Sequence, residues 1–157
     1  MAESKIELLT TPLTGGCQCG AVRYELAMQP VGAHFCHCRM CQRAVGNVFA
    51  ALAPVLKDKL WWSRKSPEFF KSSTAAQRGF CPKCGTPLTF AYNTSKWICV
   101  TIGSLDDPTR VPPTVHYGIE SQVHWLHLHD ELPREETGVN DDLKNMTVFQ
   151  FQGQSHG

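Results

Sequence analysis

Three cysteines fall within six positions of the segment "HFCHCRMCQRAVG", residues 34–46, at Cys36, Cys38 and Cys41. Thiolates are good zinc ligands; structural zinc takes four protein ligands, whereas catalytic zinc keeps three and an open position. His34 or a remote histidine could close the site as a fourth ligand. His37 should face away from an ion held by both of its neighbours. Spacing alone leaves the open and the closed site as alternatives.

A second pair of cysteines lies in "FCPKCG", residues 80–85. Cys-x-x-Cys-Gly is half of a zinc ribbon: the turn directs Cys81 and Cys84 to one side, and Gly85 takes the left-handed backbone that the turn needs. A redox dithiol is the alternative, but that motif normally opens a helix. Here Thr86-Pro87 and a β-like run follow, which favours the zinc knuckle.

The segment "GGCQCG", residues 15–20, supplies the donors that such a knuckle lacks. Cys17 and Cys19 are two apart, so in a strand they point to the same face. With Cys81 and Cys84 they make a closed Cys₄ site. If Cys81 and Cys84 instead shared a metal with two cysteines of the 36/38/41 cluster, the third cysteine of that cluster would have no metal. Cys17 and Cys19 would also have none. Ligand counting therefore favours four plus three, with two Zn²⁺ per chain.

Disulfides are the competing use for the eight cysteines of this chain. No export signal is visible at the N-terminus, and cytosolic thiols are kept reduced. Thiols this close in sequence also make strained or redundant disulfides. We therefore expect a cytoplasmic metal-binding protein, with Cys99 left over as an ordinary buried thiol in a strand.

Charge and hydropathy exclude two classes of partner. The formal net charge is +1 and there is no basic run, so nothing indicates nucleic-acid binding. The longest nearly apolar run, residues 48–56, has nine residues, whereas a membrane span needs about 20. Zn²⁺ with three thiolates would carry a local charge of −1, which Arg39 and Arg43 could offset while attracting an anionic substrate; a solvated helix face is the alternative for these two arginines.

The hydrophobic patterns predict one domain of many short strands with a single short helix. Val22, Tyr24 and Leu26 alternate on one strand face, and the helix after Cys38 should stop at Gly46. Strands are also expected in residues 114–121 and 122–132. In the second of these, His127 and His129 lack a third metal ligand. We expect an N-terminal extension over residues 1–12, the domain over 13–133, and a tail over 134–157 in which "MTVFQFQ" could form an edge strand.

Five ordered segments from residue 15 to residue 133 carry a resemblance to a known family. They are "GGCQCGAVRYE", "CHCRMCQRAVG", "KSSTAAQRGFCPKCGTPLTF", "VTIGSLDDP" and "VHYGIESQVHWLHLHDELP". In order and spacing they resemble the glutathione-dependent formaldehyde-activating enzymes, a family that includes centromere protein V. The resemblance implies a zinc-containing β-tent of small antiparallel sheets, consistent with the mainly β prediction.

The resemblance also implies roles for particular residues. It places a structural zinc on Cys17, Cys19, Cys81 and Cys84, and an open catalytic zinc on Cys36, Cys38 and Cys41. The matching substrate-site positions are Ser72, Ser73, Arg78 and His116. The implied reaction is the reversible addition of the glutathione thiol to formaldehyde, a carbon–sulfur lyase reaction.

Two departures from the family pattern and one rival function complete the expectations. Gln18 stands where a histidine is common and should not affect zinc binding, whereas Gly118 replaces a bulky aromatic and should reshape the pocket wall. The rival is a non-catalytic zinc module that carries glutathione or acts as an interaction scaffold. The sequence leaves the oligomeric state and the physiological substrate open.

Overall fold

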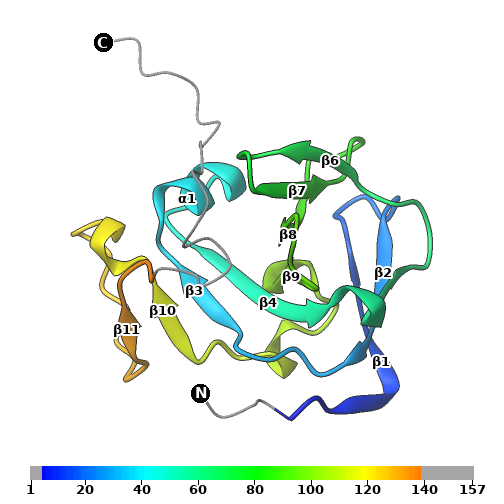
Figure 1. Cartoon of the computed structure of the whole chain (residues 1–157), viewed down its shortest axis with the longest axis horizontal. Coiled ribbons are helices and arrows are strands. Elements are labelled where there is room, and N and C mark those ends of the chain that lie inside the picture. The colour runs from blue at the N-terminus through cyan, green and yellow to red at the C-terminus, as the bar shows by residue number, and fades with distance from the viewer. Residues whose placement is uncertain (1–4, 139–157) are drawn as a thin grey trace.

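A computed structural model describes residues 5–138 of the chain as a mainly β fold with one α-helix in that range (Figure 1). The helix, α1, spans Arg39–Val45, and four single-turn 3₁₀ segments accompany it. The strands are β1 (Leu8–Gly16), β2 (Arg23–Met28), β3 (His34–Cys36), β4 (Ala50–Leu56), β5 (Leu60–Trp62), β6 (Glu68–Lys71), β7 (Ala76–Phe80), β8 (Pro87–Tyr92), β9 (Trp97–Thr101), β10 (Val115–Tyr117) and β11 (Arg134–Glu135). The predicted mainly β class with one short helix is confirmed.

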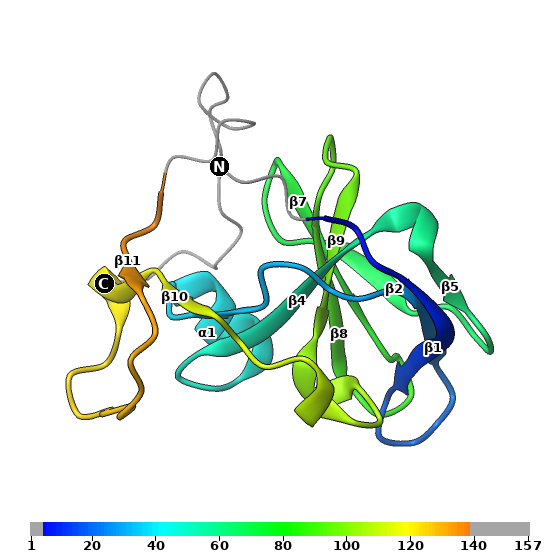
Figure 2. The same cartoon turned by 90° about the horizontal axis from the view of Figure 1, so that it is seen from below.

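The strands form two sheets, seen from two directions in Figures 1 and 2. The smaller has the order β1-β2-β5 and the larger β11-β10-β3-β4-β9-β8-β7-β6. Most neighbours are antiparallel, but β10 runs parallel to both β3 and β11. The main core lies between the small sheet and the middle of the large one, where Tyr24, Leu26, Val55 and Val100 are fully buried.

The register of the larger sheet decides which distant residues meet. Phe70 pairs with Arg78 across β6 and β7, Arg78 with Phe90 across β7 and β8, and Phe90 with Cys99 across β8 and β9. Directly opposite residues of antiparallel strands present their side chains on the same face. These four side chains therefore form one row across the sheet.

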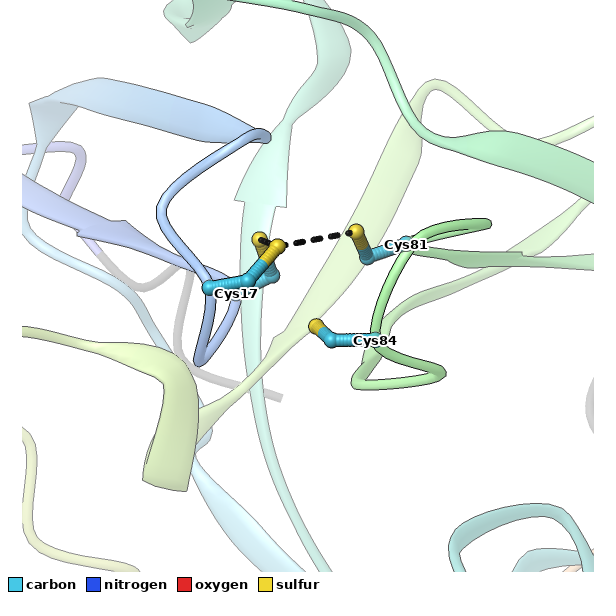
Figure 3. Close-up of side chains that lie close together, drawn as sticks. Cys17, Cys81 and Cys84 are labelled. Atoms are coloured by element: carbon cyan, nitrogen blue, oxygen red, sulfur yellow. Dashed lines mark hydrogen bonds between the residues drawn. The ribbon is translucent and has the colours of Figure 1, made fainter.

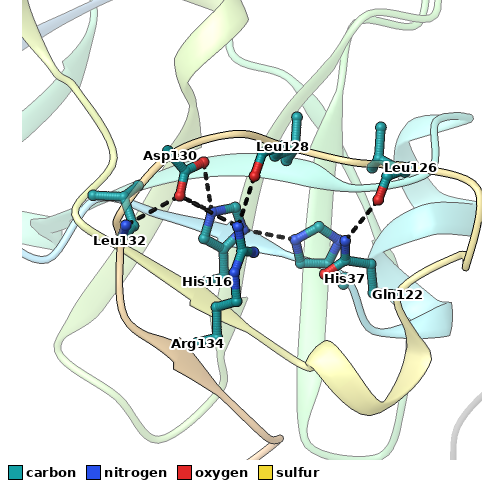
Figure 4. Close-up of polar contacts among 8 residues, drawn as sticks. All are labelled: His37, His116, Gln122, Leu126, Leu128, Asp130, Leu132 and Arg134. Atoms are coloured by element: carbon teal, nitrogen blue, oxygen red, sulfur yellow. Dashed lines mark hydrogen bonds and ion pairs between the residues drawn. The ribbon is translucent and has the colours of Figure 1, made fainter.

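The structure differs from the predicted strands in one segment. The strand predicted within residues 122–132 is wrong: this segment is irregular, because the carbonyls of Leu126 and Leu128 accept hydrogen bonds from the side chains of Gln122 and Arg134 rather than from a strand partner (Figure 4). The first strand begins at Leu8, ahead of the expected domain start at residue 13. The possible edge strand "MTVFQFQ" lies outside the described residues.

Candidate metal centres

The loops after β1 and after β7 bring four cysteines together, as ligand counting predicts. Figure 3 shows the Sγ atoms of Cys17, Cys81 and Cys84 turned toward one another. The Sγ atom of Cys19 lies 3.6 Å from that of Cys17 and 3.8 Å from that of Cys81. With Zn–S bonds of about 2.3 Å, the edge of a tetrahedron of sulfurs is about 3.8 Å. The group, which we call the four-thiol site, therefore has the spacing of a tetrahedral zinc centre.

Backbone geometry and one hydroxyl shape the four-thiol site. Gly85 takes the left-handed backbone expected of it, with φ of 78°, and the amide of Val22 donates to Cys17 Sγ at 3.2 Å. Thr86 joins the two loops, since its Oγ1 accepts from the amide of Gln18 and lies 3.1 Å from Cys84 Sγ. The hydrogen bond from Thr86 lowers the pKa of the Cys84 thiol to about 5. Sequence reasoning missed Thr86, which had no motif of its own.

Cys36, Cys38 and Cys41 form the second group, here called the three-thiol site, with Sγ atoms of Cys36 and Cys38 3.4 Å apart. Among residues 5–138 no histidine or carboxylate joins these three thiols. His34, the proposed fourth ligand, instead directs Nδ1 to the carbonyl of Gly32 at 2.8 Å and packs its ring against Tyr117. Within the described part of the chain, the three thiols therefore have no fourth protein donor grouped with them.

The chemistry of the three-thiol site suits a bound cation. Hydrogen bonding with Cys36 lowers the pKa of the Cys38 thiol to about 2, and the same contact raises that of Cys36. Cys38 therefore loses its proton easily, and its negative charge opposes the ionisation of Cys36. Three thiolates at this distance need a cation between them, and zinc is the usual choice for thiolate ligands. The donor set of each group thus fits Zn²⁺.

The three-thiol turn is anchored by α1 and by the segment after β10. Cys38 is the N-cap of α1, and its Sγ accepts from the amide of Cys41 at 3.4 Å. Inside the turn, the amide of His37 donates to the carbonyl of Tyr117 at 2.8 Å. The buried side chain of Gln42 donates to the carbonyls of His37 and Ser121, so one amide group ties the turn to residue 121.

A chain of polar side chains runs behind the turn (Figure 4), in which His37 and His116 are buried and Asp130 is exposed. His37 faces away from the thiols, as predicted, and its Nε2 lies 2.9 Å from His116 Nδ1. His116 Nε2 in turn lies 3.0 Å from the carboxylate of Asp130. The Asp130 carboxylate accepts a hydrogen bond from Nε2–H of His116. In the neutral form of His116, Nδ1 then carries no hydrogen, so it accepts a hydrogen bond from Nε2–H of His37. His116 thus reaches the three-thiol site only through His37, and Asp130 was missed because it carries no local signal.

Gly118 lies directly against the three-thiol turn. Its φ is 69°, and a Cβ built on it would come within 2.8 Å of the backbone nitrogen of Cys38. The position therefore needs glycine both for its backbone conformation and for space. We expected Gly118 to reshape a pocket wall; it is in neither of the two cavities described below, and its contact is with Cys38.

We expect Gly118→Ala to destabilise the protein by about 1–3 kcal/mol, the usual cost of a strained backbone position, and to weaken zinc binding at the three-thiol site. Gly32→Ala is the matched control, because Gly32 has a φ of 63° but nothing within 4 Å of its added Cβ. Thermal unfolding and zinc content per chain provide the measurements. Equal zinc loss in both variants would contradict the role of the Gly118–Cys38 contact.

Arg78 is the cation that the structure places beside the three-thiol site. Its Nη2 donates to Cys41 Sγ at 3.5 Å, and its guanidinium lies 4.7 Å from the ring centroid of Phe90. The side chain is buried, with 5% of its surface exposed. A charge held in this way can offset the negative charge that three thiolates around Zn²⁺ would leave.

The other expected substrate-site residues lie elsewhere. Arg39 is exposed and donates to the Gln42 side chain, and Arg43 is exposed on the same helix. Ser72 and Ser73 are buried in the turn between β6 and β7, where Ser72 bonds to Ala76 and Ser73 to Ala75. Arg39, Ser72 and Ser73 thus make these hydrogen bonds with residues other than the thiols. Cys99 does lie in a strand, as expected, but is only partly buried.

Two adjoining cavities lie near the thiol groups, although none of the three-thiol cysteines lines either cavity and Cys17 of the four-thiol site lines the second. The first, the apolar pocket, has a volume of about 300 Å³ and is lined by the end of α1 and by β6–β8, including Arg78. The second, the polar groove, has about 670 Å³ and includes Gln18, Arg23 and Asp106. Val45, Pro87 and Thr101 line both, so the two cavities meet along this wall.

The comparison with known families decides where the chain belongs. A family model described as "Glutathione-dependent formaldehyde-activating enzyme" matches residues 12–121. The chain belongs to this family. Both cysteine groups lie inside the matched range, whereas Asp130, at the end of the chain of polar side chains, lies outside it.

Two relatives of this member of the glutathione-dependent formaldehyde-activating enzyme family are only distantly similar to it in sequence. An uncharacterized lyase of Schizosaccharomyces pombe is 30% identical over 82 residues, which are 52% of this chain and 59% of the relative. A putative glutathione-dependent formaldehyde-activating enzyme of Halomonas elongata is 25% identical over 126 residues, covering 74% and 80% of the two chains. The match thus spans less than two thirds of the yeast relative.

A solved structure supports the fold. A crystal structure of a Rhodobacter sphaeroides protein superposes with a TM-score of 0.50 at 24% identity, over 60% of this chain and 88% of that one. None of the helices in the described range is long and apolar enough to span a membrane.

Proposed function

We propose that the protein is a zinc-dependent carbon–sulfur lyase that acts on glutathione adducts, such as the reversible formation of S-(hydroxymethyl)glutathione from glutathione and formaldehyde. The observation that carries this proposal is the three-thiol site, which no further histidine or carboxylate among residues 5–138 completes and beside which Arg78 lines the apolar pocket. The family match and the names of two distant relatives support it.

In the proposed reaction the glutathione sulfur forms a bond to the carbonyl carbon. The carbonyl π electrons move to oxygen, and the thiol proton ends on that oxygen. Zinc, when bound by the three thiols, would hold an incoming thiol as its thiolate at neutral pH. The chain's own contribution is to hold Cys36, Cys38 and Cys41 in place through the contacts around His37 and Gln42.

Arg78 supplies the positive charge at this site. Next to Cys41, it would stabilise the negative charge that an incoming thiolate adds and the charge that develops on the aldehyde oxygen. We assign the proton transfer to that oxygen to water, since no histidine or carboxylate among residues 5–138 belongs to the three-thiol group. Two zinc ions per chain and a reducing, cytoplasmic setting complete the proposal.

The decisive experiment must measure catalysis above the spontaneous reaction, because glutathione and formaldehyde combine unaided. At equilibrium, exchange between ¹³C-formaldehyde hydrate and the ¹³C-hydroxymethyl adduct is followed by NMR exchange spectroscopy. We expect the protein to accelerate this exchange in proportion to its concentration, and Cys36→Ser to abolish the acceleration.

The same experiment separates the proposed enzyme from the non-catalytic module. Glutathione binding measured by calorimetry, with no accelerated exchange, would establish a carrier or scaffold instead. Neither binding nor exchange would remove glutathione from the proposal altogether.

A further inference from the structure

The apolar pocket begins one helical turn from the three-thiol site. Cys41, Ala44 and Val45 are spaced three and four apart on α1, so they lie on one face of the helix. Ala44 and Val45 line the pocket, while Leu52, another lining residue, packs against Cys41. The apolar pocket therefore adjoins residues that contact Cys41, on the helix face that carries this cysteine.

The opposite wall of the pocket is the row of side chains across the larger sheet. Phe70, Arg78 and Phe90 occupy successive strands of that row and all line the pocket. In Figure 1, α1 and the β6–β8 end of the larger sheet lie opposite each other. Apart from Arg78 and the hydroxyls of Thr89 and Thr101, the lining side chains carry no polar atoms.

Glutathione itself does not suit this pocket. The tripeptide carries two carboxylates and one ammonium group, and among the lining residues only Arg78 is charged. Burying the remaining charges without partners would be costly. The polar groove suits the peptide better, because Gln18, Asn47 and the salt-bridged pair Arg23 and Asp106 supply polar groups along its walls.

We propose that the apolar pocket binds the carbonyl-derived group of the adduct, and that this group is larger and more apolar than the single carbon of formaldehyde. The inference rests on the proposed function and narrows its substrate class to glutathione adducts of aldehydes with an apolar substituent. A volume of about 300 Å³ lies at the lower end of ligand pockets. It suits a short alkyl or aryl group and leaves the peptide in the polar groove.

Stable S-alkylglutathiones test this inference without turnover. Calorimetry of the zinc-loaded protein with S-methyl-, S-butyl- and S-hexylglutathione gives the dissociation constant for each chain length. Burying one methylene group is worth about a fourfold gain in affinity. We expect affinity to rise by this factor per methylene until the pocket is full, and a flat series would overturn the inference.

Matched variants locate the effect. Phe70→Ala removes one pocket wall, whereas Phe69→Ala removes a neighbour of similar exposure, 45% against 46%, that lines neither cavity. We expect Phe70→Ala to lower the hexyl-to-methyl affinity ratio several-fold and Ala44→Phe, which fills the pocket, to bring it near one. Phe69→Ala should leave the ratio unchanged; an equal loss in both phenylalanine variants would place the alkyl chain elsewhere.

The outcome is separable from that of the proposed function. A flat alkyl series together with accelerated formaldehyde exchange would overturn the pocket inference and leave the lyase standing. A steep alkyl series without exchange of any adduct would support the pocket as a binding site and reject the lyase.

Discussion

Replacing Cys81 with serine is expected to unfold the protein, whereas Cys36→Ser is expected to yield a folded chain that retains one zinc and lacks activity. The four-thiol site joins the loop after β1 to the hairpin of β7 and β8, and so links the two sheets. A structural zinc contributes about 10–16 kcal/mol of apparent binding free energy, as much as the whole stability of a typical domain. The three-thiol site draws its ligands from one short segment and cross-links nothing distant.

Circular dichroism and zinc content per chain measure the two outcomes, with two zincs expected for the unmodified protein. Cys99→Ser is the control, because Cys99 belongs to neither thiol group, and it should keep both metals. If Cys81→Ser and Cys36→Ser unfold alike, the division into a structural and a catalytic site is wrong. A folded Cys81→Ser variant that has lost only one zinc would overturn the structural role.

The second large effect is expected at Arg78. Arg78→Met removes the charge beside Cys41 while keeping an unbranched side chain of comparable reach against Phe90. Loss of one electrostatic group at a reacting centre typically costs about 10²–10³ in rate, and we expect a fall of that order in accelerated exchange. Arg78→Lys keeps the charge but loses the planar stack on Phe90, so it should retain more activity than Arg78→Met.

Arg110→Met serves as the control for Arg78→Met, since Arg110 is exposed and lies outside both cavities. It should exchange at the unmodified rate. Full activity of a folded Arg78→Met protein would show that Arg78 only fills space. A binding measurement with glutathione then tells whether lost activity reflects weaker binding or slower chemistry.

The parts of the site that the sequence predicted are those set by local spacing. Two thiols separated by one or two residues must lie close whatever the rest of the chain does, so both cysteine groups followed from ligand counting. The turn glycine Gly85 and the helix end at Gly46 followed in the same way from their backbone requirements. The strands were predicted where burial alternates, as at Tyr24 and Leu26.

What the sequence could not predict depends on register between distant strands. Arg39 and Arg43 were the arginines nearest to the thiols along the chain, and only the family resemblance indicated Arg78, which strand pairing brings to Cys41. The buried contact between His37 and His116 follows from the parallel pairing of β3 with β10, which no local pattern reveals. Residues 122–132 likewise follow an irregular path, with side-chain hydrogen bonds from Gln122 within the segment and from Arg134 beyond it.

The order in which the chain is synthesised has a consequence for metal loading. Cys19 leaves the ribosome 62 residues before Cys81, so the four-thiol site cannot close until more than half of the chain exists. The contact between His37 and His116 can form only later still, because 79 residues separate them in the chain. The nascent chain therefore exposes reduced thiols well before it can shelter them, and we expect zinc supply during translation to limit the yield of folded protein.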